Sequence, residues 1–74
     1  MTKAGNKAAV LKAKARKQAN RLERKAQALG MRGWDLVNLA GAVEFGYLEI
    51  EAEGYALMDQ ADALMRRVRA LRGA

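Results

Sequence analysis

The sequence predicts an all-α protein, an antiparallel helical hairpin that we expect to oligomerise. Three observations carry this prediction: no proline interrupts the chain, apolar residues recur at helical spacing, and a pair of glycines separates a basic segment from an acidic one. At 74 residues the chain is one domain at most. Chains of this size bury a core that is only marginally sufficient, so a second copy or another partner is expected.

The first predicted element is a basic helix over residues 1–29. Its apolar stripe is Ala4, Ala8, Leu11, Ala15, Ala19, Leu22, Ala26 and Leu29. Alanine favours a helix but supplies little apolar area for burial. Like-charged pairs four residues apart, such as Lys12 with Arg16, cost about 0.2–0.5 kcal/mol each at low salt. We therefore expect this helix to lie beside negative charge.

A turn is predicted over residues 30–34, in the sequence "GMRGW". Gly30 suits the position after a helix C-terminus, and Gly33 adds a second flexible point. Asp35 suits the start of the next helix, where an acidic side chain favours the free N–H groups. The turn would lay the second helix antiparallel to the first.

The third predicted element is a long helix over residues 35–72 with a basic C-terminal end. Its apolar seam alternates by four and three, as in a coiled coil, through Leu36, Ala40, Val43, Tyr47, Ile50, Gly54, Leu57, Ala61, Leu64, Val68 and Leu71. The alternative is a three-helix bundle, with the long helix broken near Gly54. The hairpin is favoured because the seam keeps its phase through Gly54.

The charges fall into three blocks along the chain. Residues 1–33 hold ten bases and one acid, residues 34–65 hold seven acids and no base, and residues 66–74 hold four arginines. A turn at 30–34 would bring opposite charges level. The predicted inter-helix ion pairs join Lys12, Lys14 and Arg16 to Glu53, Glu51 and Glu49. Exposed pairs contribute about 0–1 kcal/mol each, so they would set register more than stability.

The long helix carries more apolar surface than the basic helix can cover, and this surplus predicts a homo-oligomer. The predicted oligomer interface is Val37, Leu48, Tyr55, Leu57, Met58, Leu64, Met65, Val68 and Leu71. The most apolar run, residues 36–48, is shorter than the roughly 20 residues that cross a bilayer, so a membrane is not expected as a partner.

Surplus positive charge predicts a basic pole that contacts nucleic acid or another polyanion. The predicted phosphate contacts are Lys3, Lys7, Arg66, Arg67, Arg69 and Arg72. Such contacts are salt-dependent and indifferent to base sequence, and no base-reading motif is present. Arginine near a helix C-terminus also complements the helix dipole, which explains part of this charge without any ligand.

Enzyme chemistry has little support, because the chain holds no Cys, His or Ser. We expect no catalytic residues, no metal, no cofactor and no small-molecule substrate. The leading hypothesis is a non-enzymatic, self-assembling structural subunit of a virion, filament or nucleoid-like assembly. The alternative is a small adaptor or regulatory module that binds an acidic or helical protein. Neither a secretory signal nor a transmembrane segment is recognised, so the expected location is the cytoplasm or an assembled particle.

Overall fold

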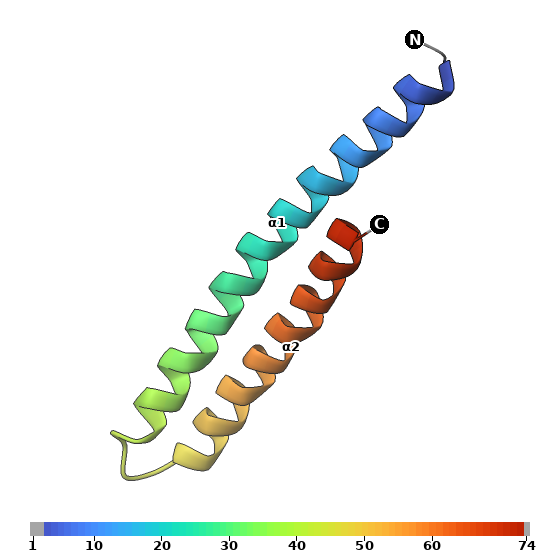
Figure 1. Cartoon of the computed structure of the whole chain (residues 1–74). Coiled ribbons are helices and arrows are strands. Elements are labelled where there is room, and N and C mark those ends of the chain that lie inside the picture. Colours follow the sequence, from blue (N-terminus) through green and yellow to red (C-terminus); the bar gives the residue numbers. More distant parts are fainter. Residues whose placement is uncertain (1–2, 74) are drawn as a thin grey trace.

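The computed structural model describes residues 3–73, with side chains from residue 6 onward. It contains two helices, α1 (Lys3–Ala40, 38 residues) and α2 (Tyr47–Gly73, 27 residues). The helices lie side by side and antiparallel (Figure 1). Together they form a rod with extents of 65 × 13 × 12 Å. The prediction of an all-helical chain with two packed helices is confirmed.

The predicted turn at residues 30–34 is wrong, because α1 continues through Gly30 and Gly33 to Ala40. The helix boundaries predicted at residues 29 and 35 are wrong for the same reason. Each interior glycine costs about 1 kcal/mol relative to alanine. Packing against α2 offsets that cost: Gly33 is buried and Gly30 is half-buried.

The chain reverses over residues 41–46 instead. The last turn of α1 tightens, with the Ala42 N–H donating to the Leu39 carbonyl at 2.9 Å. Gly46 has a φ of 76°, the left-handed conformation that glycine adopts without strain. Its carbonyl accepts from the Ile50 N–H at 3.2 Å, which begins α2. The reversal therefore depends on the glycine at position 46.

The alternative three-helix bundle is also wrong, because α2 passes through Gly54 without a break. Gly54 is buried against α1. Neither helix, over the residues described, has an apolar run long enough to cross a membrane.

The core is a single seam in which buried residues recur every seven positions, all alanine or glycine except Val68. The buried residues are Ala19, Ala26, Gly33 and Ala40 on α1, and Gly54, Ala61 and Val68 on α2. Larger side chains between them, such as Leu29 and Leu64, are half-buried. A seven-residue repeat keeps one stripe of each helix facing its partner, as in a coiled coil. The seam positions predicted from Ile50 to Leu71 all lie on this inner face.

The backbones of the two helices come into direct contact at Gly33 and Gly54. A Cβ atom placed on Gly33 would lie 2.5 Å from the Gly54 carbonyl oxygen, and one on Gly54 would lie 2.7 Å from the Gly33 carbonyl oxygen. Real Cβ contacts are not this short, so the backbones touch at a point that admits only glycine. These two glycines allow contact along the rest of the seam.

Apolar burial explains why this hairpin forms in place of the predicted one. The predicted register followed from a turn at residues 30–34 and would have formed three exposed ion pairs, each contributing about 0–1 kcal/mol. The observed register packs α1 leucines against α2 leucines, and full burial of one leucine contributes about 1.5–3 kcal/mol. Several half-buried leucines therefore outweigh the charge pairing.

The shifted turn makes α1 the longer helix, so α1 extends past the C-terminal end of α2 (Figure 1). This reverses the predicted lengths, in which the second helix, over residues 35–72, was the longer one. We call residues 3–16 the overhang. At 1.5 Å per residue it is about 21 Å long.

Candidate nucleic-acid interface

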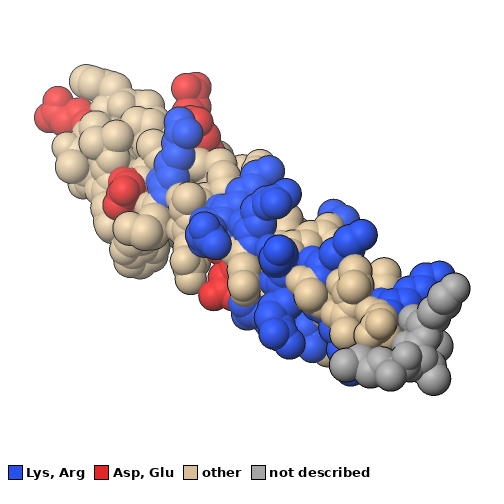
Figure 2. Space-filling model, turned by 90° about the horizontal axis from the view of Figure 1, so that it is seen from above, with Lys and Arg blue, Asp and Glu red and all other residues tan. Residues whose placement is uncertain are grey.

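Charge is segregated between the two halves of the rod. We define the basic half as residues 3–25 with 66–73, and the turn half as residues 26–65. The basic half holds thirteen bases and one acid, a net charge of +12, and the turn half holds one base and seven acids, a net charge of −6. Figure 2 shows basic side chains gathered along one part of the rod and acidic ones mainly at the other end. The antiparallel fold thus joins the first and last charge blocks of the sequence.

The side of α1 that faces away from α2 carries a row of bases, which we call the outer row. It consists of Lys17, Arg21 and Arg24, and these residues line a shallow hollow together with Asn20. All four residues are exposed. Spacings of four and three residues place the three bases on one side of the helix, and the row is about 10 Å long.

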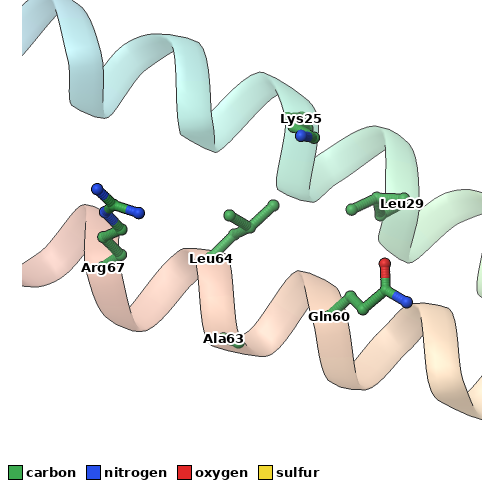
Figure 3. A pocket seen from close by; sticks show the side chains of 6 residues that line it. All are labelled: Lys25, Leu29, Gln60, Ala63, Leu64 and Arg67. Atoms are coloured by element: carbon green, nitrogen blue, oxygen red, sulfur yellow. The ribbon is translucent and has the colours of Figure 1, made fainter.

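A second basic feature lies between the helices. Lys25 of α1 and Arg67 of α2 line one hollow with Leu29 and Leu64 (Figure 3). The two cations come from different helices toward the same opening. Both are exposed, whereas the leucines beneath them are half-buried. Because both residues are positively charged and line the same hollow, an anion between them would be favoured.

A third hollow lies on α2, lined by Arg66 and Arg69 together with Asp62 and Met65. Asp62 is four residues before Arg66, the spacing at which opposite charges interact on a helix surface. This hollow therefore includes an acidic side chain, unlike the hollow of the outer row.

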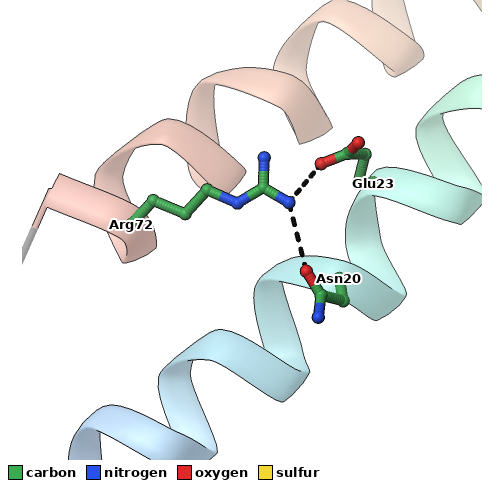
Figure 4. A network of polar contacts seen from close by, with 3 residues as sticks. All are labelled: Asn20, Glu23 and Arg72. Carbon is green, nitrogen blue, oxygen red and sulfur yellow. Dashed lines mark hydrogen bonds and ion pairs between the residues drawn. The ribbon is translucent and has the colours of Figure 1, made fainter.

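Arg72 of α2 makes polar contacts with α1 in the same chain. Its guanidinium donates through Nη2 to Asn20 Oδ1 at 3.1 Å and forms an ion pair with Glu23 (Figure 4). The side chain of Arg72 is 46% exposed and that of Glu23 is 29% exposed. The contacts hold the last turn of α2 against α1, and they place the single acid of the basic half beside an arginine.

The predicted basic pole is not one cluster. Arg66, Arg67 and Arg69 lie level with the region around Lys25. Lys7 lies eighteen residues before Lys25, about 27 Å away along the helix. The structure does not describe the side chain of Lys3. The error follows from the misplaced turn, which had brought the two groups to the same end.

The predicted inter-helix ion pairs do not form within the chain. Lys12, Lys14 and Arg16 lie on the overhang, whereas Glu49, Glu51 and Glu53 lie near the turn at the other end of the rod. The register of the hairpin explains this separation. Arg72, near the end of α2, contacts Asn20, so α2 does not run alongside residues 12–16.

Seven of the nine predicted oligomer-interface residues lie on or beside the seam within the hairpin. Val37, Leu57, Met58, Leu64, Met65, Val68 and Leu71 are all buried or half-buried. Leu48 and Tyr55 remain 67% and 48% exposed. The surplus of apolar surface was overestimated because α1 is longer than predicted and covers the inner face of α2.

The sequence interpretation missed several residues that the fold exposes. Met31, Trp34 and Phe45 are 69%, 56% and 87% exposed in the turn half. The outer row was also missed, although its spacing of four and three residues was visible in the sequence. That spacing alone would have separated a basic face from the apolar stripe.

Comparison of the chain with protein-family models, with curated proteins and with solved structures finds no match.

Proposed function

We propose that this chain is a non-enzymatic, self-assembling helical subunit whose basic half contacts nucleic-acid phosphates without sequence specificity. A virion, filament or nucleoid-like assembly is the setting that such a subunit fits. The single observation that carries the proposal is the concentration of thirteen bases and one acid in one half of a narrow rod.

Mutual repulsion within the basic half supports this proposal. Lys17 with Arg21, and Arg21 with Lys25, are like-charged pairs four residues apart on α1. Each pair destabilises the helix by about 0.2–0.5 kcal/mol at low salt. Phosphates beside the outer row remove this repulsion and release counterions from the nucleic acid, which is the main source of sequence-independent affinity.

The geometry of the basic half suits a backbone contact rather than base reading. A single helix with exposed bases can lie along a phosphate chain. The exposed aromatic residues Trp34, Phe45, Tyr47 and Tyr55 are all in the turn half, which holds a single base, Arg32. Base stacking requires aromatic and basic side chains in the same groove. The expected binding is therefore electrostatic.

The test is titration with an arbitrary duplex DNA at several salt concentrations, followed by fluorescence anisotropy. With about six phosphate contacts, affinity should fall about a thousandfold between roughly 50 and 200 mM salt. A second duplex of unrelated sequence should bind equally. Absence of binding at low salt would remove the proposal.

A matched pair of variants locates the contact. Arg21→Gln removes an exposed arginine from the outer row, and Arg32→Gln removes an exposed arginine from the turn half of the same helix. Removing one arginine that touches a phosphate should lower the slope of log affinity against log salt by about 0.9. Arg21→Gln should show this change and Arg32→Gln should not. Equal effects would mean that only net charge matters.

The alternative function is an adaptor that binds an acidic or helical protein partner. The exposed side chains of Trp34 and Phe45 favour it, because large apolar side chains are typical of protein contacts. The same titration separates the two functions: an adaptor would leave duplex DNA unbound at low salt.

A further inference from the structure

The overhang continues the buried seam without a partner. Ala8, Leu11 and Ala15 lie in steps of three and four residues on the same side of α1 as the buried Ala19 and Ala26. Ala8 and Leu11 are exposed, with Leu11 at 57%, whereas Ala15, nearest the end of α2, is half-buried. Along the described chain, α2 ends before it reaches these positions. The overhang therefore presents an unoccupied extension of an established interface.

Bases flank this exposed stripe on both sides. At 100° per residue, Lys14 lies on one side of the stripe, and Lys12 and Arg16 lie on the other. Charged residues beside a coiled-coil seam select the partner, and basic flanks require acidic ones. A partner helix should thus carry a short apolar stripe between glutamates.

The outer face of α2 near the turn has these features. Leu48, Ala52 and Tyr55 are exposed and are spaced by four and three residues. Helical geometry places Glu51 on one side of this stripe and Glu49, then Glu53, on the other. The stripe faces away from α1, whose contacts are with the seam around Gly54. It is separated from the overhang by most of the length of the rod, so the two cannot meet within one chain.

We propose that the overhang of one copy packs antiparallel on this outer face of α2 in a second copy. When the two helices are antiparallel, both stripes advance by three residues and then by four, so their positions match. The pairing places Ala8 against Tyr55, Leu11 against Ala52, and Ala15 against Leu48. Each pair joins one small and one large side chain, which is the complementarity that a close helix contact requires.

The same alignment pairs the flanking charges. Antiparallel packing brings Lys12 and Arg16 beside Glu53 and Glu49, and Lys14 beside Glu51. The ion pairs that the single chain cannot form thus become contacts between copies. The net charges of the two halves, +12 and −6, favour this head-to-tail arrangement over contact between two basic halves.

The contact uses different surfaces on the two copies, so each copy retains a free overhang or a free outer face. Such heterologous contacts extend into open chains unless a rotation closes them. The outer row of bases lies on the opposite side of α1 and stays free for phosphates. This inference rests on the self-assembly in the proposed function and names the surfaces that carry it.

The test is sedimentation of the nuclease-treated chain at moderate salt, without nucleic acid. The wild-type chain should form species larger than a dimer, and high salt should shorten them. Leu11→Asp should abolish this growth, whereas Val10→Asp should not. Val10 is a matched control because it is 53% exposed and lies outside the stripe, about 100° around the helix from Leu11.

Mixing two variants gives the sharpest readout. Leu11→Asp lacks a working overhang, and Leu48→Asp lacks a working outer face. Each variant alone should be a monomer, and an equal mixture should form a dimer that does not grow further. Helical content measured by circular dichroism confirms that both variants are folded, as expected for substitutions at exposed positions.

Three outcomes would overturn the inference: a monomeric wild-type chain, assembly that survives Leu11→Asp, or a mixture that stays monomeric. Loss of assembly in Trp34→Ala together with its survival in Leu11→Asp would assign the contact to the turn end instead. DNA titration is independent of these results. A monomer that still binds DNA with the expected salt slope would remove the head-to-tail contact and leave the phosphate contact standing.

Discussion

Replacing Gly33 by alanine, with Gly30→Ala as the control, tests the backbone contact between α1 and α2. In Gly33→Ala the new Cβ would lie 2.5 Å from the Gly54 carbonyl oxygen and 2.8 Å from Met58 Cγ. The methionine can move, but the carbonyl belongs to the α2 backbone, so the helices must separate. In Gly30→Ala the new Cβ would lie 3.7 Å from Ala61 Cβ, an ordinary van der Waals contact.

The two substitutions share one favourable effect, so their difference isolates the clash. Both replace a helical glycine by alanine, which stabilises the helix by about 1 kcal/mol. Overpacking at Gly33 costs about 1–3 kcal/mol in addition. Gly30→Ala should therefore be more stable than Gly33→Ala by about 1–3 kcal/mol. For a domain of this size the separation in Tm is about 4–8 °C per kcal/mol.

The measurement is thermal and urea unfolding of both variants, monitored by circular dichroism. The Leu11→Asp background and several protein concentrations exclude a contribution from assembly to the apparent stability. Gly30→Ala should unfold above the wild-type chain, and Gly33→Ala at or below it. Equal stabilisation by both substitutions would refute the contact between Gly33 and Gly54, and with it the register of the hairpin.

Three further predictions concern the turn, the seam and the end of α2. Gly46→Ala should lower the free energy of unfolding by about 1–2 kcal/mol, since alanine is strained at a φ of 76°. Gly41→Ala is its control and should be neutral or stabilising, because its Cβ would lie 3.5 Å from the nearest atom. Ala26→Leu should cost about 1–3 kcal/mol at a buried position, whereas Ala28→Leu, on the exposed side, should be nearly neutral in urea unfolding. Arg72→Gln should cost only about 0–1 kcal/mol, because the ion pair is partly exposed, and should speed hydrogen exchange in the last turn of α2; a larger drop in stability would contradict this assignment.

The helical class and the phase of the seam were readable from the sequence. The stripe through Ala19, Leu22, Ala26 and Leu29 faces α2, as its spacing predicts, and the stripe from Ile50 to Leu71 faces α1. The period of the apolar positions depends only on the geometry of the α-helix, which is local. Segregation of charge is likewise a property of the residue order.

The position of the turn was not readable by the same means. The apolar alternation keeps its phase through Gly33, as it does through Gly54, and also across the loop at residues 41–46. Continuity of the stripe favours an unbroken helix at Gly54, and it favours one equally at Gly33. Periodicity therefore predicted the faces and left the reversal undetermined. The predicted basic pole and the predicted ion pairs both depended on a turn at residues 30–34. Because the chain reverses at residues 41–46, these residues are grouped differently in the fold.

The sequence by itself determined that this chain is helical, that each helix has one apolar stripe on which alanine or glycine recurs, and that the two ends are basic. Only the tertiary structure decided which glycines bend the chain and which lie between packed helices. The physical reason is that helix propensity is a local property, whereas packing depends on residues far apart in the sequence. Helix propensity penalises each interior glycine by about the same 1 kcal/mol, so local energetics cannot choose among them. Packing sums contacts over a whole register, and the backbone contact between Gly33 and Gly54 exists only when the chain reverses at residues 41–46.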